Sequence, residues 1–135
     1  MPRHLLHHPE ELAVVRLESG TEPDWEWRGG PYASMTASAH ETSVVCLADR
    51  VPAGATSNGP YHGFEVAGPL AFDMYGVLHG LLEPLATRRI GILAMSTYDT
   101  DWILVPADRA EEAADALKRS GCLVTPPVLP GGSST

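Results

Sequence analysis

Apolar residues after residue 73 recur with the spacing of one face of a helix. They occupy positions i, i+3, i+4, i+7, i+8 and i+11, and they are Met74, Val77, Leu78, Leu81, Leu82 and Leu85. Asp73 precedes this stripe, where its carboxylate can accept hydrogen bonds from the free N–H groups of the first turn. Arg88 and Arg89 follow it, and cations are favoured at the negative end of a helix. The pattern predicts a helix over residues 74–89, with a kink at Pro84.

Strands and a second helix are predicted around this one. Short runs rich in β-branched and aromatic residues predict strands at 64–68, 90–95, 102–105 and 122–125. Residues 90–95 are apolar on both faces, so this strand is expected in the centre of its sheet. Asp108 and Glu111 form a capping-box pattern at the start of the second helix, and Gly121 ends it. The resulting order, β-α-β-β-α-β, is the split βαβ arrangement of a ferredoxin-like sandwich.

The first half of the chain carries two further predicted strands, over 33–38 and 42–47, around a polar bend. Residues 35–41 are similar to residues 95–101 at a shift of 60, so that Glu41 corresponds to Asp101. Ala48-Asp49-Arg50 matches Ala107-Asp108-Arg109 at a shift of 59. These matches predict a duplicated module whose first copy has lost or shortened its helices. The alternative is that two hairpins in one chain resemble each other by chance.

The expected organisation follows from these elements. A chain of 135 residues suits one compact domain or two very small ones. We expect a degenerate first module over residues 10–61 and a complete second module over residues 62–125. Residues 126–135 are expected to form a flexible tail.

The net charge and the composition of single segments limit which binding partners and which cellular location we expect. The chain has 9 Lys and Arg against 17 Asp and Glu, a formal charge of −8. Nucleic acid and anionic membranes would be repelled over most of such a surface, so neither is an expected partner. No apolar run reaches the roughly 20 residues of a membrane-spanning helix, and residues 1–9 lack the apolar core of a secretory signal. Cys46 and Cys122 are expected to be buried or half-buried thiols rather than a disulfide or metal pair, and a cytoplasmic protein is the simplest interpretation.

Catalytic and metal-binding signatures are missing from the sequence. It has no phosphate-binding Gly-rich loop, nucleophile elbow or HExxH motif, and no cysteine cluster with metal-ligand spacing. His4, His7 and His8 are expected to be solvated in a frayed terminus. We expect neither enzyme activity nor a metal or cofactor.

Two loops have the composition of a small-ligand site. Gly68 to Asp73 leads into a helix N-terminus, whose unpaired N–H groups suit a carboxylate or another small anion. Ser96 to Asp101 combines hydroxyls, an aromatic ring and two carboxylates, which favour a cation such as an α-ammonium group. Together they predict a site for a free amino acid. The alternative is structural: the aspartates bond their own backbone in a turn, and Gly68-Pro69 ends a strand.

These loops also carry a family resemblance. Residues 64–70 (Phe-Glu-Val-Ala-Gly-Pro-Leu), residues 76–78 and above all residues 92–105, with their Ser-Thr-Tyr-Asp-Thr-Asp segment, are similar to small tandem ACT-domain proteins. Arginine sensors of the CASTOR type carry related ACT domains. Residues 41–46 and 50–54 resemble the first-module signature of the same group.

This resemblance covers roughly residues 10–125 and implies an α+β fold. The fold would have two ACT-like (ferredoxin-like βαββαβ) modules, the first degenerate, with antiparallel sheets and helices on one face. The resemblance also implies an amino acid held between modules and, often, a dimer.

The resemblance further implies which positions contact the ligand. Carried over position by position, they are Ser43, Val44, Ala71, Asp73, Met74, Thr97, Tyr98, Thr100 and Asp101. The loop position that is acidic in the arginine sensors is Met74 here, so an apolar or small amino acid is expected at least as much as a basic one. The chain has about half the length of the sensors, and a homodimer would be needed to supply four modules.

These observations predict a non-catalytic, amino-acid-binding regulatory protein that acts on an enzyme or another protein partner. The alternative is an ACT-type assembly module without a functional ligand site. Trp25, Trp27 and Trp102 would then be interface anchors, whereas the other interpretation gives them a core or lid role.

Overall fold

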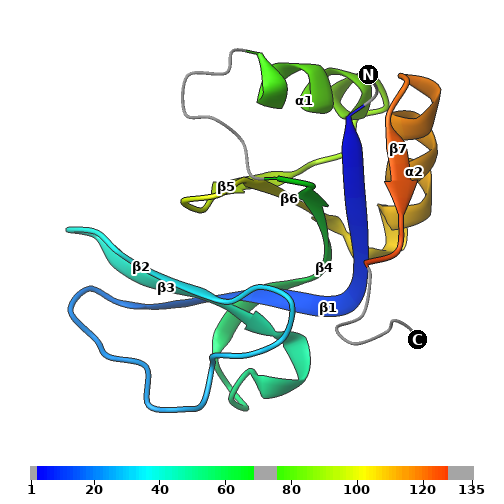
Figure 1. Ribbon diagram of the computed structural model, residues 1–135. Coiled ribbons are helices and arrows are strands. Elements are labelled where there is room, and N and C mark those ends of the chain that lie inside the picture. The colour runs from blue at the N-terminus through cyan, green and yellow to red at the C-terminus, as the bar shows by residue number, and fades with distance from the viewer. Residues whose placement is uncertain (1–2, 69–75, 128–135) are drawn as a thin grey trace. The chain divides into compact units, whose positions relative to one another are not determined.

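Two long strands organise the chain: β1 (His4–Glu18) and β4 (Thr56–Val66). The computed structural model describes residues 3–68 and 76–127, and these form two compact units (Figure 1). We call residues 9–62 the sheet unit, and residues 3–8 together with the described part of 63–127 the helical unit. Each long strand therefore contributes one of its ends to each unit.

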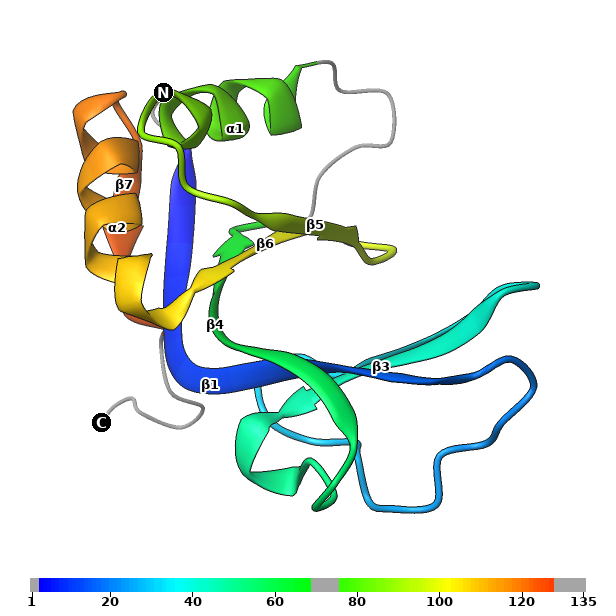
Figure 2. The ribbon, with the colours of Figure 1, turned by 180° about the vertical axis from the view of Figure 1, so that it is seen from behind.

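The helical unit contains two helices and three short strands besides its ends of β1 and β4. These elements are α1 (Val77–Thr87), β5 (Leu93–Ser96), β6 (Asp101–Pro106), a 3-10 turn (Ala107–Arg109), α2 (Ala110–Arg119) and β7 (Leu123–Thr125). The strand order is β7-β1-β4-β6-β5, with β7 parallel to β1 and β5 antiparallel to β6. Figures 1 and 2 show both helices on one face of these strands.

The predicted helix stripe is confirmed from Val77 onward, because Leu81 and Leu85 are buried and the other members pack against the same core. The remaining buried residues of that core come from the strands, α2 and the segment before β5. They are Leu5, Phe64, Val66, Ile90, Ile103, Val105, Ala110, Ala113, Ala116 and Leu117. Since side chains alternate along a strand, the helices cover one face of the strands in this unit.

The sheet unit contains β2 (Ser34–Ala37), β3 (Glu41–Leu47), a 3-10 turn (Ala48–Arg50) and its ends of β1 and β4. The strand order is β2-β3-β1-β4, and β3 pairs antiparallel with both of its neighbours. Residues 9–62 are all described and contain no α-helix. Instead, Trp25 and Trp27 pack against the buried core formed by Val15, Val44 and Cys46. These two tryptophans therefore have a core role in the sheet unit.

The hairpins β2–β3 and β5–β6 are built alike. Ser38 N–H donates to Glu41 O at 2.9 Å in one turn, and Thr97 N–H donates to Thr100 O at 2.8 Å in the other. These positions correspond at a shift of 59, as do the two 3-10 turns that follow the hairpins. The expected match of Glu41 with Asp101 is therefore wrong by one residue. Thr42 is the true counterpart of Asp101, since a one-residue slip would exchange the two faces of a strand.

The arginine at the end of each 3-10 turn makes the same kind of contact. Arg50 donates to the backbone carbonyl of Arg28. Arg109 donates to the carbonyl of Arg88 at 3.2 Å and to that of Arg89 at 3.4 Å. In both units, a guanidinium holds the segment that precedes the hairpin.

The N-terminal segment differs from the expected frayed terminus, because residues 4–18 form β1. His8 is buried, its Nε2 lies 2.9 Å from Glu65 Oε1, and its ring stacks on Trp102. The other two histidines also have partners: His4 Nε2 lies 2.7 Å from Thr125 Oγ1, and His7 stacks on Phe64. The prediction of solvated histidines is wrong because strands distant in sequence supply these contacts.

Two details of the helical unit also differ from expectation. β5 lies at the edge of the strand order rather than in its centre. The apolar run that predicted a central strand includes Ile90, which packs into the core before β5 begins. α2 begins after the 3-10 turn with Arg109 as its N-cap and no side-chain capping bond. The capping box predicted for Asp108 and Glu111 is therefore absent from this helix start.

Candidate functional site

The β5–β6 turn carries four of the predicted site residues, Thr97, Tyr98, Thr100 and Asp101. The Thr97 hydroxyl accepts a hydrogen bond from Thr100 N–H at 3.2 Å and donates to Thr100 O at 3.2 Å. Serine and threonine hydroxyls stabilise turns in this way by bonding the nearby backbone. The turn is thus fixed by its own side chains.

Thr100 fastens this turn to the end of β4. Its hydroxyl donates to Val66 O at 2.6 Å, and the side chain is buried. Satisfying both a buried hydroxyl and a buried carbonyl avoids the cost of unpaired polar groups. Val66 is the last residue of β4, so the turn lies where the connection from β4 to α1 begins.

The other side chains of the turn are exposed or half-buried. Tyr98 is 82% exposed, and Asp99 is exposed beside it. Asp101 is half-buried, and one of its carboxylate oxygens accepts a hydrogen bond from Ser96 Oγ at 2.7 Å. A carboxylate has further acceptor capacity beyond one such bond, and this capacity can serve a cationic ligand.

The connection from β4 to α1 is described only at its ends. Ala71, Asp73 and Met74 lie outside the described residues, so the predicted capping by Asp73 does too. α1 begins at Val77, and Gly76 is its N-cap with a left-handed φ of 71° and no side-chain capping bond. Figures 1 and 2 both show the start of α1 and the β5–β6 turn on the same side of the helical unit.

Ser43 and Val44 belong to the sheet unit. Val44 is completely buried, and β3 is flanked by β1 and β2, so its backbone lies inside the sheet. Ser43 keeps an accessible side chain, whose hydroxyl donates to Glu41 Oε1 at 2.7 Å. The predicted site residues that the structure describes therefore lie in two units. Thr97, Tyr98, Thr100 and Asp101 lie in or next to a turn of the helical unit, and Ser43 and Val44 lie in a central strand of the sheet unit.

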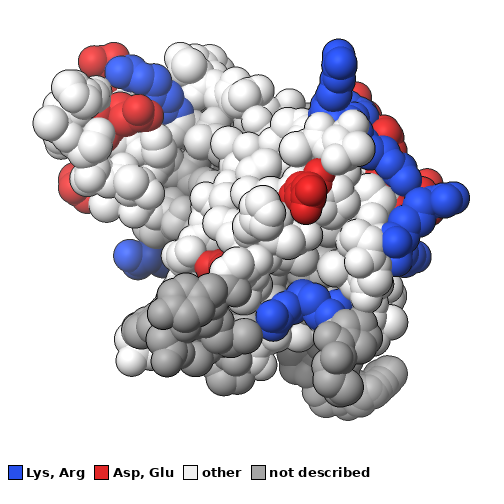
Figure 3. Space-filling model, turned by 90° about the horizontal axis from the view of Figure 1, so that it is seen from above, with Lys and Arg blue, Asp and Glu red and all other residues white. Residues whose placement is uncertain are grey.

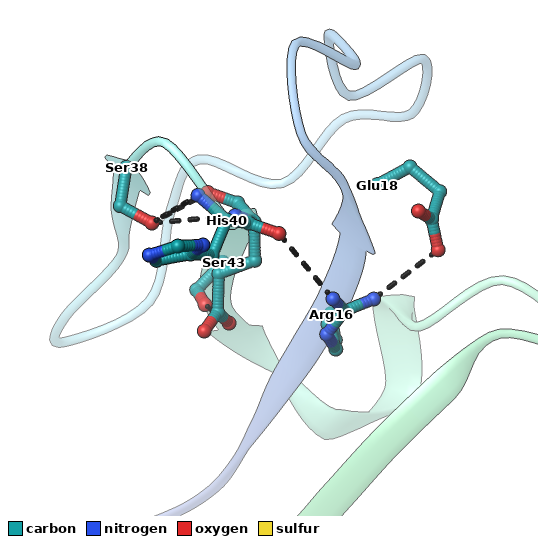
Figure 4. Close-up of polar contacts among 6 residues, drawn as sticks. Arg16, Glu18, Ser38, His40 and Ser43 are labelled. Carbon is teal, nitrogen blue, oxygen red and sulfur yellow. Dashed lines mark hydrogen bonds and ion pairs between the residues drawn. The ribbon is translucent and has the colours of Figure 1, made fainter.

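A polar cluster around Ser43 escaped the sequence reasoning (Figure 4). Arg16 donates to Glu18 Oε2 at 3.2 Å and to the carbonyl of His40 at 3.4 Å, which ties β1 to the β2–β3 turn. Ser38 Oγ accepts from the backbone N–H groups of His40 and Glu41, as Thr97 does in the other hairpin. The pairing of Arg16 with Ser43 across β1 and β3 could have revealed the cluster only once the register was known.

Reactive side chains are scarce in the described residues. Burial raises the pKa of the Cys46 thiol, which disfavours the thiolate that a nucleophilic cysteine needs. Within residues 3–68 and 76–127, no group of three or more His, Cys, Asp or Glu is placed to hold a metal ion. In the same residues, no helix combines the length and the apolar character needed to cross a membrane.

Comparison with known proteins identifies the class of this fold. An ACT-domain family model matches residues 57–119. A crystal structure of a protein from Agrobacterium tumefaciens is similar to this chain, with a TM-score of 0.85, 32% identity and 96% of each chain covered. The chain therefore belongs to the same family as the Agrobacterium tumefaciens protein, and its residues 57–119 match an ACT domain.

More distant structures share the fold alone. A Vibrio cholerae protein of unknown function, described as a possible transport protein, has a TM-score of 0.69 and 17% identity, covering 84% of this chain and 85% of that one. The regulatory subunit of aspartate kinase from Thermus flavus has a TM-score of 0.61 and 9% identity, covering 86% of this chain and 95% of that one. No curated protein sequence matches the chain.

Proposed function

We propose that this protein is a non-catalytic regulator that binds a free amino acid in its ACT domain. The ACT-domain match and the likeness to a regulatory subunit of aspartate kinase support this class of function. The observation that carries it is the buried bond from Thr100 Oγ1 to Val66 O, because it fixes the β5–β6 turn to the last residue of β4, just before the connection to α1 begins.

The chemistry of these loops suits the two ends of an amino acid. The free N–H groups at the start of α1 favour a carboxylate. Asp101 offers a half-buried carboxylate to the α-ammonium group, and Tyr98 offers an exposed ring beside it. Because the resemblance to the arginine sensors places Met74 at a loop position that is acidic in them, we propose an apolar or small amino acid at least as readily as a basic one.

The assembly alternative has less support. Its proposed anchors included Trp25 and Trp27, which pack in the core of the sheet unit. Trp102 is buried as well, at 5% exposure. A homodimer and a regulated protein partner belong to the proposal as well, with ligand binding as the event that the partner senses.

A thermal-shift screen with each of the twenty amino acids tests ligand binding. A ligand that binds only the folded protein adds about 2.7 kcal/mol of stability at a hundredfold excess over its Kd. We expect one or a few related amino acids to raise the melting temperature clearly. An unchanged melting temperature with all twenty amino acids at high concentration would contradict the proposal.

The variant Asp101→Ala tests the site itself. We expect it to weaken binding of the hit by at least about tenfold, while the loss of one exposed hydrogen bond lowers stability by about 1 kcal/mol or less. Asp99→Ala is the matched control in the same turn and should bind normally. Equal losses of stability and binding in Asp101→Ala would make Asp101 a structural turn residue instead.

A further inference from the structure

Residues 19–33, which we call the strap, link β1 to β2 without forming a helix or a strand, and all of them are described. Figures 1 and 2 show this segment looping along one side of the sheet unit. From the strap, Trp25 and Trp27 pack against the buried apolar side chains of β1 and β3. The strap therefore covers an apolar face of these two strands.

The corresponding face in the helical unit is covered by helices. At the shift of 59 that relates the two hairpins, Val44 corresponds to Ile103 and Cys46 corresponds to Val105. Ile103 and Val105 are buried in the core to which α1 and α2 contribute. The strap thus stands where the other unit has helices. A helix is held by its own backbone hydrogen bonds, whereas the strap depends on its side chains and on the residues that contact it.

Arg50 holds the end of the strap that leads into β2. Its guanidinium donates to the carbonyl of Arg28, as the arginine after the other hairpin does for the end of α1. Gly29 and Gly30 follow, with φ of 121° and 74°. A Cβ at Gly29 would lie 3.0 Å from Arg50 Nη1, and one at Gly30 would lie 2.9 Å from the side chain of Leu47. The two glycines therefore allow the strap to lie directly against Arg50 and Leu47.

The middle of the strap is held less firmly, by two half-buried indole rings. Trp25 Nε1 is buried without a hydrogen-bond partner of ordinary geometry among the described residues. The nearby Cys46 sulfur is a weak acceptor, and the Trp25 N–H offsets only part of the rise that burial causes in the pKa of Cys46. A buried N–H without a good acceptor costs free energy that water returns when the segment opens. The closed strap is therefore only moderately stable.

We propose that the strap opens as a unit while β3 stays paired between β1 and β2, and that Arg50 is the residue that holds it closed. Opening releases Trp25 and Trp27 and leaves both ladders of β3 intact, so it costs less than opening the strands. The sheet unit then has two states, one with its apolar face covered and one with that face accessible. This inference does not rest on amino-acid binding, and the two can fail separately.

Cys46 reports on the state of the strap. Its side chain is completely buried, and burial raises the pKa of its thiol, so the closed strap both hides the sulfur and disfavours the thiolate. In a Cys122→Ser background, Cys46 is the only cysteine of the chain. Its rate of labelling by an excess of an aromatic disulfide reagent gives the equilibrium constant for opening.

Two properties of this labelling separate the strap from the strands. We expect an opening constant at least about tenfold larger than the constant obtained from amide exchange of Val44 and Cys46. We also expect the opening constant to depend on urea less than about half as steeply as global unfolding does, because opening the strap exposes less surface.

Arg50→Met tests the residue that holds the strap, because methionine keeps an apolar stem and lacks the guanidinium. We expect it to speed the labelling of Cys46 by about tenfold and to change amide exchange of β3 by less than about threefold. Arg16→Met is the matched control, because Arg16 contacts Glu18 and the carbonyl of His40 in the same unit without contacting the strap end at Arg28. Its labelling rate should stay within about twofold of the background.

Labelling as slow as β3 exchange, with the urea dependence of global unfolding, would show that Cys46 reacts only when the strands open, and would overturn the strap. An unchanged rate in Arg50→Met, or an equal increase in Arg16→Met, would overturn the role of Arg50. Circular dichroism identifies a variant that fails to fold, and the urea dependence of the Cys122→Ser background still tests the strap in that case. The amino-acid screen reports on ligand binding whatever the state of the strap.

Discussion

Arg89 occupies a backbone position that usually belongs to glycine. It follows α1 with a φ of 58°, in the left-handed region. Its N–H donates to Ala86 O at 2.9 Å, and Ile90 N–H donates to Leu85 O at 3.0 Å. At the end of α2, Gly121 N–H donates to Lys118 O and Cys122 N–H donates to Leu117 O, each at 3.0 Å. Both helices thus end in the same motif, once with glycine and once with arginine.

This difference gives a prediction at the scale of one residue. Arg89→Gly should stabilise the protein by about 1 kcal/mol, because it relieves the left-handed strain of a residue that has a Cβ. Gly121→Ala is the matched control and should destabilise by a similar amount. Urea unfolding measures both. A loss of stability in Arg89→Gly would mean that the arginine side chain contributes more than its backbone costs.

Residue environments were the hardest feature to predict from the sequence. His8 looked solvated because its neighbours in sequence are polar, yet Glu65 and Trp102 bury it. Thr100 was predicted as a ligand contact, and the bond that its hydroxyl donates to Val66 O was not foreseen. Both contacts depend on strand order and register, and neither leaves a local pattern in the chain.

At the scale of elements, a set of ion pairs joins α1 to α2. Arg88 donates to Asp115 Oδ2 at 3.2 Å, and Arg119 donates to the same oxygen at 2.9 Å. Arg109 pairs with Glu112 at 2.8 Å while holding the carbonyls after α1. Figure 3 shows basic and acidic side chains interleaved along the edge where α2 lies. The charges at these helix ends are therefore balanced locally.

These pairs predict how stability depends on pH. The hydrogen bond from Arg109 lowers the pKa of Glu112, and the hydrogen bond from Arg119 lowers that of Asp115. Each carboxylate therefore stabilises the fold fully above its ordinary pKa, of 4.5 and 3.8 respectively, and loses that contribution as pH falls through its lowered pKa. We expect urea stability to fall with acidification through this range.

The double variant Glu112→Gln, Asp115→Asn should be less stable at neutral pH and should lose less stability on acidification. Glu111→Gln, on the same turn of α2, forms no ion pair among the described residues and should follow the wild-type profile. Because both carboxylates are exposed, the effects should be modest and should shrink with added salt. An unchanged profile in the double variant would contradict the assignment.

Elements with a strong period could be predicted from the sequence, and elements without one could not. The stripe from Val77 to Leu85 repeats at a helical spacing, and the helix lies there. β1 contains His4, His7, His8 and Pro9, which interrupt any alternation, and no strand was predicted there. β5 was placed in the centre because Ile90 was counted with the strand, although Ile90 packs beneath the helices.

At the scale of the whole molecule, the two units have unequal cores. The helical unit buries side chains from both helices and several strands, whereas the buried apolar residues of the sheet unit come from β1 and β3 alone. They are Leu12, Ala13, Val15, Val44, Val45 and Cys46. Apolar burial supplies most of the free energy that keeps a region closed. The sheet unit should therefore open more readily.

Amide hydrogen exchange tests this difference. We compare β3 with β6, because each lies between two other strands and the comparison holds backbone pairing constant. Amides of β3 should exchange at least about tenfold faster than those of β6. Equal protection would show that the two units open as one.

The duplication predicted from the sequence stays a prediction, although the two hairpins and the arginines that follow them make similar contacts. The sequence allowed the two hairpins to be aligned at a shift of 59 or of 60. Only the hydrogen bonds of the two turns showed that the shift is 59. The ligand site was predicted from loop composition. The bond from Thr100 to Val66, which fixes the β5–β6 turn to the end of β4, was not foreseeable before the strands were placed.

The first few residues belong to the helical unit, where His4 to Leu6 pair with β7. Trimming the gene at codon 9 to make a shorter expression clone would remove a strand that the far end of the polypeptide pairs with. Residues 4–6 thus take part in the packing of α2 and β7. Any useful dissection of this protein must keep both ends together, for example by joining them in a circular permutant.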